Sequence, residues 1–454
     1  MRDLALTLVF AALMTQVFKT PVMGAYLWAW FSFMNPHKLT YGFAYLMPFA
    51  QIIALTTMLV LLFTRKRQWV PLNLVTGLWA CLVIWMTVTS AFALNLPELV
   101  FDRWYFVMKI QVMTLVTLML VTTEKDLKRL VLVVTLSVCF FGVKGGVFTA
   151  LTGGSYHVWG PPDGMLGGNN EFAVGLVMLI PMLFWMHQTA TKRWVRTALT
   201  ASIVLCMLSV LGTQSRGALL AVVAMGIFLG LKSAHPLRVS LLIGLSMLLA
   251  LAFMPDSWTQ RMDTITTYQG DESAQSRLWT WQTLWNVAVD RPLVGAGFRA
   301  EALFIFQRYA PYSAEGAAFL EAGKSWVAHS IYFQMLGEQG FPGLFFFLAL
   351  WTAVWVRAGR LAKRAQAIPE LASWLPLLMR MSQVSLIGYA VGGAFLSLAY
   401  LDLPYYFMGY VVLAEIFIVR RQAQSKAAGA PSTPVPEGAS AHSGIARPGL
   451  VSEG

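Results

Sequence analysis

The stretch HSIYFQMLGEQGFPGLFFFLALWTAVWV, residues 329–356, decides the fold of this chain. Apolar residues dominate it over more than the roughly 20 residues that a helix needs to cross a bilayer. It nevertheless begins with a histidine, and it carries Gln334 and Glu338 four residues apart, which places both on one helix face. A carboxylate inside a membrane is costly unless it is paired or protonated. We therefore predict a membrane helix whose first turns belong to a polar network.

The whole chain shares this apolar character. Of its 454 residues, 57% are hydrophobic and only 12% are charged. Since a helix satisfies its own backbone hydrogen bonds in lipid, the sequence predicts an all-α polytopic membrane protein. No small-residue cleavage site follows the first apolar run, so we interpret it as a retained helix and not as a signal peptide. Twelve spans are predicted, near residues 4–20, 44–63, 71–93, 103–121, 128–150, 169–187, 195–212, 217–231, 236–254, 329–356, 376–400 and 403–420.

Positive charge is divided unequally between the two sides of these spans. The formal net charge is +12, but the Lys and Arg residues gather in short loops, which favours membrane topology over nucleic-acid binding. The short outer loops hold three of them, Lys38, Arg103 and Arg216. The other side is predicted to be cytoplasmic, with both termini on it. It holds eighteen, at residues 2, 65–67, 125, 128–129, 192–193, 196, 232, 238, 357, 360, 363–364 and 420–421.

Residues 21–43 admit two interpretations. Their aromatic-rich part, WAWFSFMNPHKLTYGF, could form a further span or could lie at the membrane interface. A full extra span would place the basic triplet at residues 65–67 outside, so the interfacial interpretation is favoured.

Four regions are predicted along the chain. Residues 1–254 form N-terminal transmembrane helices, and residues 329–420 form C-terminal ones. Residues 255–328 form a large outer loop, in which SAQSRLWTWQTLWNVAVD has a helical period with Trp281, Trp285 and Ala288 along one face. Loops of this length are commonly lids or binding elements. Residues 421–454, rich in Ala, Ser, Gly and Pro, are predicted to be a disordered cytoplasmic tail.

Two arginines stand at the predicted outer surface. Arg216, at the start of a span, could bind lipid phosphate by snorkelling or could bind a substrate anion. Arg277 could be a solvated charge of the loop helix. The two gain functional weight together if the loop folds back over the outer ends of the spans. In that case they would suit the oxygens of a diphosphate.

His329 is the third candidate of this group. A single histidine at a helix start can be structural, but imidazole is also the side chain that most readily serves as a base near neutral pH. Glu338 lies deeper on a face rotated away from it, about 13 Å further along the axis. We therefore interpret Glu338 as part of an interhelical network and not as a proton donor to His329. Pro342 frees the carbonyl of Glu338 and is expected to kink the helix.

Three further residues are candidates for substrate binding. Lys144 lies deep in a predicted span, where a lysine is a functional candidate by default. Asp402, between the last two spans at the outer surface, could orient a histidine or arginine or could cap a helix. Arg103 could bind substrate or could form a local ion pair with Asp102. The cysteines and histidines show no metal-ligand spacing, so neither a metal nor another cofactor is predicted.

These residues stand within motifs that resemble a known superfamily. The motifs are an Ser-Arg pair at residues 215–216, SAQSR at 273–277, PLVGAGF at 292–298 and AHSIYFQMLGEQGFPG at 328–343. Together they resemble the O-antigen ligase and O-antigen polymerase superfamily, with WaaL-type O-antigen ligases as the nearest match. NPHKLTYGFA and GVKGGVFTALTGG look like the exosortase-associated O-glycosylation ligase branch. The resemblance covers most of residues 1–420.

The resemblance implies a fold, an activity and a site. The fold would have about twelve transmembrane helices and a large periplasmic loop, as in a GT-C-like glycosyltransferase. The activity would be inverting, metal-independent transfer of a glycan from undecaprenyl diphosphate to the lipid A–core oligosaccharide, among membrane lipids at the periplasmic face of a bacterial inner membrane. The essential arginines would be Arg216 and Arg277, the histidine His329 and the aspartate Asp402. An early periplasmic basic residue would correspond to Arg103.

Several alternatives stay open at this stage. His329 could be the base for the acceptor hydroxyl or a ligand of the diphosphate. The chain could be an O-antigen polymerase, which extends a lipid-linked glycan, or it could attach the glycan to a protein. A transporter would also use intramembrane charge, but the sequence shows no internal repeat of broken helices.

Overall fold

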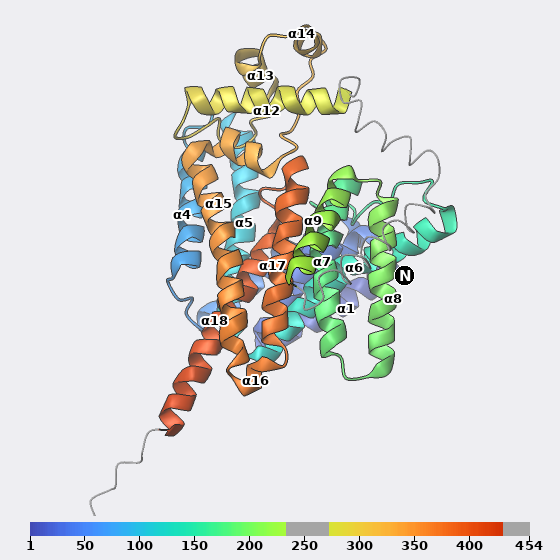
Figure 1. Cartoon of the computed structure of the whole chain (residues 1–454), viewed down its shortest axis with the longest axis vertical. Helices are drawn as coiled ribbons and strands as arrows, with labels where there is room; N and C mark the ends of the chain where they lie inside the picture. The colour runs from blue at the N-terminus through green and yellow to red at the C-terminus, as the bar shows by residue number, and fades with distance from the viewer. Residues whose placement is uncertain (233–271, 430–454) are drawn as a thin grey trace, which may run out of the picture.

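The computed structural model describes residues 1–232 and 272–429, which form helices joined by loops (Figure 1). One helix, α12, lies across one end of the bundle, here called the outer end, and α16 lies at the opposite, inner end. The helices of the N-terminal part are α1 (Arg2–Lys19), α2 (Val22–Met34), η1 (Pro36–Leu39), η2 (Phe43–Leu46), α3 (Phe49–Phe63), α4 (Leu74–Ser90), α5 (Pro97–Leu120), α6 (Glu124–Thr152), α7 (Asn169–Thr189), α8 (Arg193–Gly212) and α9 (Arg216–Lys232). The C-terminal part has α12 (Glu272–Asp290), α13 (Leu303–Tyr309), α14 (Ala314–Glu321), α15 (Ile331–Gln366), α16 (Pro369–Ala372), α17 (Leu375–Gly392), η4 (Gly393–Phe395) and α18 (Asp402–Gly429).

Eleven of the twelve predicted spans coincide with helices of the described part. The twelfth, residues 236–254, lies outside the described residues, as does the loop segment 255–271. Five helices (α6, α7, α8, α15 and α18) are long and apolar enough to cross a membrane, and α2, α3, α4 and α9 are shorter apolar helices. The structure therefore agrees with a polytopic helical membrane protein, and the number of twelve spans stays a prediction.

The interfacial interpretation of residues 21–43 is wrong. Residues 22–34 form α2, which is buried over most of its length and packs against α1, α3 and α6. The Asp3 carboxylate at the start of α1 accepts backbone hydrogen bonds from Gly42 and Ala44 at 2.9 and 3.1 Å. The Tyr26 hydroxyl, near the start of α2, donates to the Asp126 carboxylate at 3.1 Å. Thus α1 and α2 form an antiparallel pair within the bundle.

Because residues 1–43 form two helices, the N-terminus lies at the other end of the bundle from the one predicted. An ion pair of 3.2 Å between Lys38 and Asp163 joins the segment after α2 to the α6–α7 loop. The far end of α18 is tied instead to the first residue of α6, through an ion pair of 2.8 Å between Arg421 and Glu124. The two ends of the described chain therefore lie toward opposite ends of α6. The prediction of both termini on one side allotted a single crossing to residues 1–43, whereas these residues form the two helices α1 and α2.

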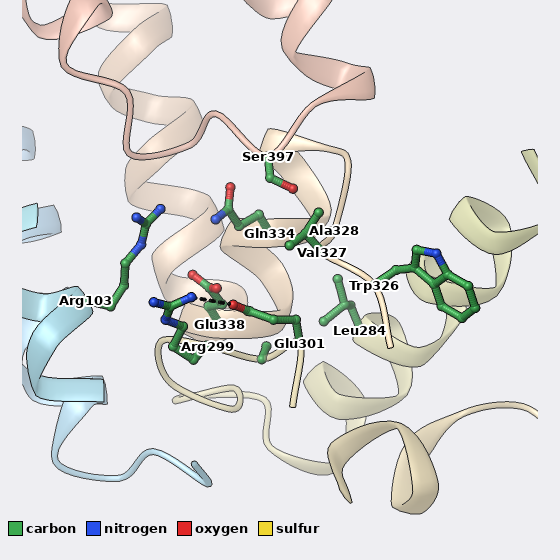
Figure 2. Close-up of a pocket in the computed structure, with 11 residues that line it drawn as sticks. Arg103, Leu284, Arg299, Glu301, Trp326, Val327, Ala328, Gln334, Glu338 and Ser397 are labelled. Carbon is green, nitrogen blue, oxygen red and sulfur yellow. Dashed lines mark hydrogen bonds and ion pairs between the residues drawn. The ribbon is translucent and has the colours of Figure 1, made fainter. Parts of the chain in front are cut away.

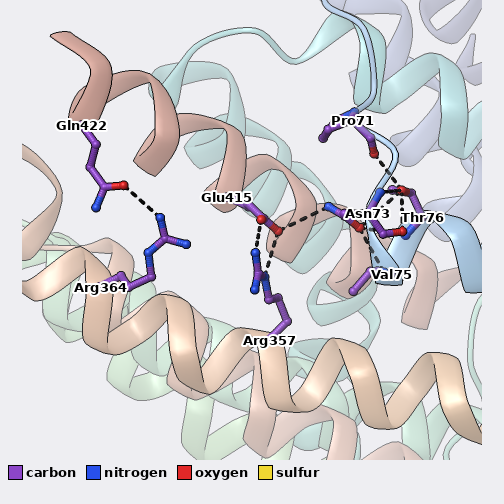
Figure 3. A network of polar contacts seen from close by, with 8 residues as sticks. All are labelled: Pro71, Asn73, Val75, Thr76, Arg357, Arg364, Glu415 and Gln422. Carbon is purple, nitrogen blue, oxygen red and sulfur yellow. Dashed lines mark hydrogen bonds and ion pairs between the residues drawn. The ribbon is translucent and has the colours of Figure 1, made fainter. Parts of the chain in front are cut away.

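The inner end of the bundle holds a polar network (Figure 3). Arg357 of α15 forms an ion pair with Glu415 of α18, whose carboxylate also accepts a hydrogen bond from Asn73. Farther along, Arg364 donates to Gln422 at 2.9 Å. Because α18 continues to Gly429, the prediction of a disordered tail is wrong for residues 421–429, and residues 430–454 lie outside the described part.

The decisive helix α15 is broken where the sequence predicts a kink. Gly340 has a φ of +69°, a non-helical conformation, and Pro342 follows it. The carbonyl of Glu338, which Pro342 leaves without its helical donor, accepts the backbone N–H of Gly297 at 2.8 Å. The loop at residues 291–299 therefore joins the backbone of α15 at the break, and the predicted kink is confirmed.

The helix at residues 272–290 also confirms its predicted face. The Trp281 ring stacks on Phe333 of α15 with centroids 5.0 Å apart, and Trp285 packs edge-on against Phe341. Ala288 is fully buried. The outer helix α12 is thus fixed across the first turns of α15 (Figure 1).

Replacement of Gly340 with alanine is expected to destabilise the protein by more than the roughly 1–3 kcal/mol that a strained backbone costs. A Cβ there would meet the carbonyl oxygen of Leu293, in addition to the unfavourable positive φ. Gly153→Ala is the matched control, because Gly153 has a φ of +60° with open space around the added methyl. Thermal unfolding in detergent would measure both. Equal losses in Tm would contradict the close approach of the 291–299 loop.

Candidate functional site

His329 stands at the outer end of α15, two residues before the helix begins. Its φ is +45°, which is uncommon for a residue with a side chain and marks local strain. Its backbone N–H donates to the Ser397 hydroxyl at 2.8 Å, and the next residue, Ser330, caps α15. The loop between α17 and α18 therefore holds the histidine in place. Sequence reasoning gave no role to Ser397, because it lies 68 residues away.

The imidazole of His329 lies in a half-buried, electropositive environment. Burial lowers its pKa below the ordinary value of 6.5, and the nearby positive charge of Arg277 lowers the pKa further. Among residues 1–232 and 272–429, no group forms a hydrogen bond with its Nδ1, which is buried. The lowered pKa favours the neutral form of the imidazole at pH 7, the form in which one ring nitrogen can accept a proton.

The activity of the protein is expected to persist to a lower pH than an ordinary histidine would allow. A base must be neutral to accept a proton, so activity falls as pH drops through the pKa of His329. Because that pKa is lowered, the acid limb should lie below pH 6.5. In Arg277→Gln the residual activity should show this limb at higher pH, whereas Arg277→Lys should leave it nearly unchanged. Profiles of kcat against pH would test this, and an identical limb in all three proteins would contradict it.

Arg277 lies near both His329 and a carboxylate that the sequence analysis missed. Arg277 belongs to α12, and its charge acts on both His329 and Glu171 in the first turn of α7. Glu171 is largely buried, and its carboxylate balances part of the positive charge. The packing of α12 on α15 shows that the described part of the loop folds back over the membrane helices. Nothing local to the sequence GGNNEFAV marked this glutamate.

Arg216 begins α9 in the same part of the outer end. Asn169, the first residue of α7, donates to the carbonyl of Thr213 at 2.9 Å, which ties the α8–α9 turn to the helix that carries Glu171. The backbone beside Arg216 also packs on Phe395, two residues before the serine that holds His329. Arg216 is half-buried. The structure thus places the helix starts of the predicted arginine–histidine group in one region.

A cavity of about 180 Å³ adjoins His329 through Ala328 and Ser397 (Figure 2). Its polar walls come from α5, the 299–301 segment, α15 and the loop before α18. Neither Arg216 nor Arg277 lines it. The lining residues are Arg103, Leu284, Arg299, Ala300, Glu301, Trp326, Val327, Ala328, Gln334, Glu338 and Ser397.

Two arginines and two carboxylates face this cavity. Arg299 forms an ion pair of 3.2 Å with Glu301. The Arg103 guanidinium lies over the ring of Tyr400, 5.6 Å from its centroid, and the Tyr400 hydroxyl donates to Glu338 at 2.6 Å. Glu338 thus belongs to an interhelical network, as expected, but it also lines a cavity, which the sequence analysis missed. The reason is that the 299–301 segment reaches α15 through contacts distant in sequence.

Asp402 and Lys144 do not line the cavity beside His329. Asp402, expected at the outer surface, is instead buried, lies beside Ser32 and lines a second cavity of about 180 Å³. Lys144 is exposed on α6. Gly146, two residues after Lys144, serves helix packing, because a Cβ there would overlap the carbonyl of Leu205 on α8. The substrate-binding roles of Asp402 and Lys144 therefore stay predictions.

Comparison with known families divides the chain in two. Residues 201–348 match a family model described as O-antigen ligase, and this segment contains Arg216, Arg277 and His329. Residues 1–191 match a family of unknown function. No curated protein shows a match. All but one of the residues that line the second cavity, Asp402 being the exception, belong to the segment matched by the family of unknown function.

Proposed function

We propose that the chain, whose residues 201–348 match an O-antigen ligase family model, transfers a glycan from undecaprenyl diphosphate to the lipid A–core oligosaccharide. The observation that carries the proposal is the position of His329 beside Arg277 and next to a polar cavity. The reaction takes place at the periplasmic face of a bacterial inner membrane. The outer end of the bundle, with α12, faces the periplasm.

Arg277 and Arg216 hold the diphosphate of the donor. Guanidinium groups donate paired hydrogen bonds to phosphate oxygens, and the electropositive region between α7, α9 and α12 favours an anion. As the glycan leaves, negative charge develops on the diphosphate, and fixed cations stabilise that charge in the transition state. Glu171 fixes Arg277 through its opposite charge. These residues neutralise the leaving group without a metal.

His329 takes the proton of the acceptor. An acceptor hydroxyl oxygen forms a bond to the anomeric carbon while the bond from that carbon to the diphosphate oxygen breaks. The hydroxyl proton passes to the imidazole, whose lowered pKa keeps it neutral before the reaction. Attack opposite the leaving group inverts the anomeric centre. Undecaprenyl diphosphate leaves, and the proton returns from the imidazolium to water.

The protein in nanodiscs, with EDTA present, tests the proposal directly. Undecaprenyl-diphosphate-linked glycan and lipid A–core are supplied together, and products are separated on a gel. A conjugate of glycan and lipid A–core is expected. If the lipid-linked glycan is extended instead and lipid A–core stays unmodified, the protein is a polymerase and the ligase proposal fails. Absence of transfer to either acceptor would direct the test to a protein acceptor.

A further inference from the structure

We propose that the second cavity, the one that Asp402 lines, binds the head group of one membrane lipid, with the lipid phosphate at Lys109 and a primary ammonium group at Asp402. Phosphatidylethanolamine has this head-group chemistry. The reaction steps proposed above use neither residue, so the inference goes beyond glycan transfer and is tested apart from it. It assigns a ligand to the segment that matches the family of unknown function.

The second cavity has a lining of two kinds. Its volume of about 180 Å³ suits a compact head group and not one that carries a sugar chain. The polar side chains of the lining are those of Ser32, Asn35, Lys109, Asp163 and Asp402. Most of the remaining lining is apolar and includes the rings of Trp28, Phe33 and Phe106. An apolar pocket with a few polar groups is typical of a small-ligand site, in which the polar groups fix the orientation of the ligand.

An apolar face of α5 brings the second cavity to the lipid-facing surface of the bundle. Phe106 and Lys109 line the cavity beside this face, and both are exposed. The exposed residues of the face itself recur at helical spacing and are apolar or aromatic, namely Phe101, Tyr105, Val112 and Leu115. Because an exposed apolar face of a membrane helix borders lipid, a lipid can reach the cavity from the side.

Lys109 supplies the cation of the site. It lies six residues after Arg103, about 9 Å further along the helix axis at 1.5 Å per residue. Its Nζ lies over the rings of Tyr105 and Phe106, 4.6 and 5.9 Å from their centroids. Among residues 1–232 and 272–429, it forms neither a hydrogen bond nor an ion pair. A lysine at a lipid-facing surface is costly unless its charge is met. A phosphate group meets that charge and accepts hydrogen bonds from the ammonium.

Asp402 is the carboxyl group left for a cation of the ligand. The other acidic residue of the lining, Asp163, already forms an ion pair of 3.2 Å with Lys38. Asp402 is buried beside the Ser32 hydroxyl and forms no ion pair with the described residues, Lys109 included. An ammonium group bound there would donate hydrogen bonds to the carboxylate and hold it ionised. Groups that suit an anion and a cation thus line one cavity without pairing, which matches a ligand whose two charges are joined by a short linker.

The α6–α7 loop fixes the rim of the cavity. The amide nitrogen of Asn35 donates to the carbonyl of Pro162 at 3.0 Å. The backbone N–H of Gly160 donates to Gly167, and that of Gly167 donates to Gly164, at 3.0 and 2.9 Å. A Cβ at Gly164 would come within 3.0 Å of the Asn35 amide nitrogen. The loop is therefore closed and packed on the end of α2 without a ligand, so the head group need not order it.

Native mass spectrometry of the full-length protein in detergent measures the binding. Phosphatidylethanolamine, phosphatidylglycerol and phosphatidylcholine with identical acyl chains are added in separate titrations. Wild type should bind one phosphatidylethanolamine about tenfold more tightly than either of the others, since phosphatidylglycerol has no cation for Asp402 and phosphatidylcholine has no N–H to donate. Soluble phosphoethanolamine in excess should leave the bound lipid in place, because it lacks acyl chains.

Three variants test the parts of the site separately. Lys109→Gln should weaken the binding of both phosphatidylethanolamine and phosphatidylglycerol about tenfold or more, since each loses a hydrogen bond from a charged group. Asp402→Asn should lower the binding of phosphatidylethanolamine to the level of phosphatidylglycerol and leave the latter unchanged. Ala50→Phe changes no charge and should weaken the binding of all three lipids, because the added ring fills the cavity that Ala50 lines.

Controls remove the same charges elsewhere. Lys19→Gln at the end of α1 and Glu98→Gln in the first turn of α5 change exposed residues, and both should bind lipid as wild type does. The Tm of each variant shows whether it is folded. Equal binding of the three lipids by wild type, unchanged binding in folded Lys109→Gln, or displacement by soluble phosphoethanolamine would overturn the inference. Glycan transfer is measured in none of these experiments, so a failure of the proposed function leaves their outcome unaffected.

Discussion

Replacement of His329 with alanine is expected to lower kcat for glycan transfer by about 100- to 10,000-fold, the usual contribution of a positioned base. The imidazole lies beside Arg277, its pKa is lowered, and its Nδ1 is buried without a hydrogen-bond partner among the described residues. Alanine removes the proton acceptor and leaves the backbone N–H that binds Ser397. Initial rates of conjugate formation at saturating donor and acceptor would measure the loss.

A matched substitution and the pattern of kinetic constants distinguish the roles of this histidine. His187→Ala changes a histidine in the last turn of α7, and it should leave kcat within a few-fold of wild type. If His329 is the base, kcat falls and the KM for donor changes little. If it holds the diphosphate, the donor KM rises instead. Wild-type rates in His329→Ala would remove the histidine from the reaction.

Replacement of Arg277 with glutamine is expected to lower kcat about 100- to 1,000-fold, as loss of one fixed group that stabilises transition-state charge does. Arg277 lies close enough to His329 and Glu171 for its charge to act on both. Lysine keeps the charge but not the paired donors, so Arg277→Lys should lie between the two. Conjugate formation under single-turnover conditions would measure each rate.

The control for Arg277→Gln is a second arginine substitution at the outer end of the bundle, Arg308→Gln. Arg308 is exposed at the end of α13 and lies over the Tyr309 ring, outside both cavities. Arg308→Gln should therefore transfer glycan at the wild-type rate. If Arg308→Gln and Arg277→Gln lose activity equally, the effect belongs to the net charge of the outer surface and not to a site at Arg277.

The residues that the sequence predicted best are those whose environment is set by their own helix. The length of the apolar run predicted α15. Pro342 predicted its kink, because proline has no N–H to donate to the carbonyl four residues earlier. The periodicity of residues 273–290 predicted α12 and the face that carries Trp281. Each of these depends on neighbours within a few positions, so a local pattern contains the information.

The parts that sequence reasoning missed depend on contacts between distant segments. Glu171 lies near Arg277 of α12, which comes more than a hundred residues later in the sequence. Arg299 and Glu301 reach Glu338 only because their loop joins α15 at the break. The α1–α2 pair was missed for another reason. Its second helix has 13 residues, too few for a span-length signal, although it is buried inside the bundle.

The break in α15 has a mechanical consequence for the reaction. Backbone hydrogen bonds join Gly297 and Ala296 to the carbonyls of Glu338 and Gly337, and the indole of Trp85 donates to the next carbonyl, that of Gln339. The loop at residues 291–299, α4 and α15 are therefore joined at the break, where they replace the helical hydrogen bonds that α15 lacks. The segment 302–328 is tied instead to α12, because the indoles of Trp279 and Trp281 donate to the carbonyls of Pro311 and Ala328.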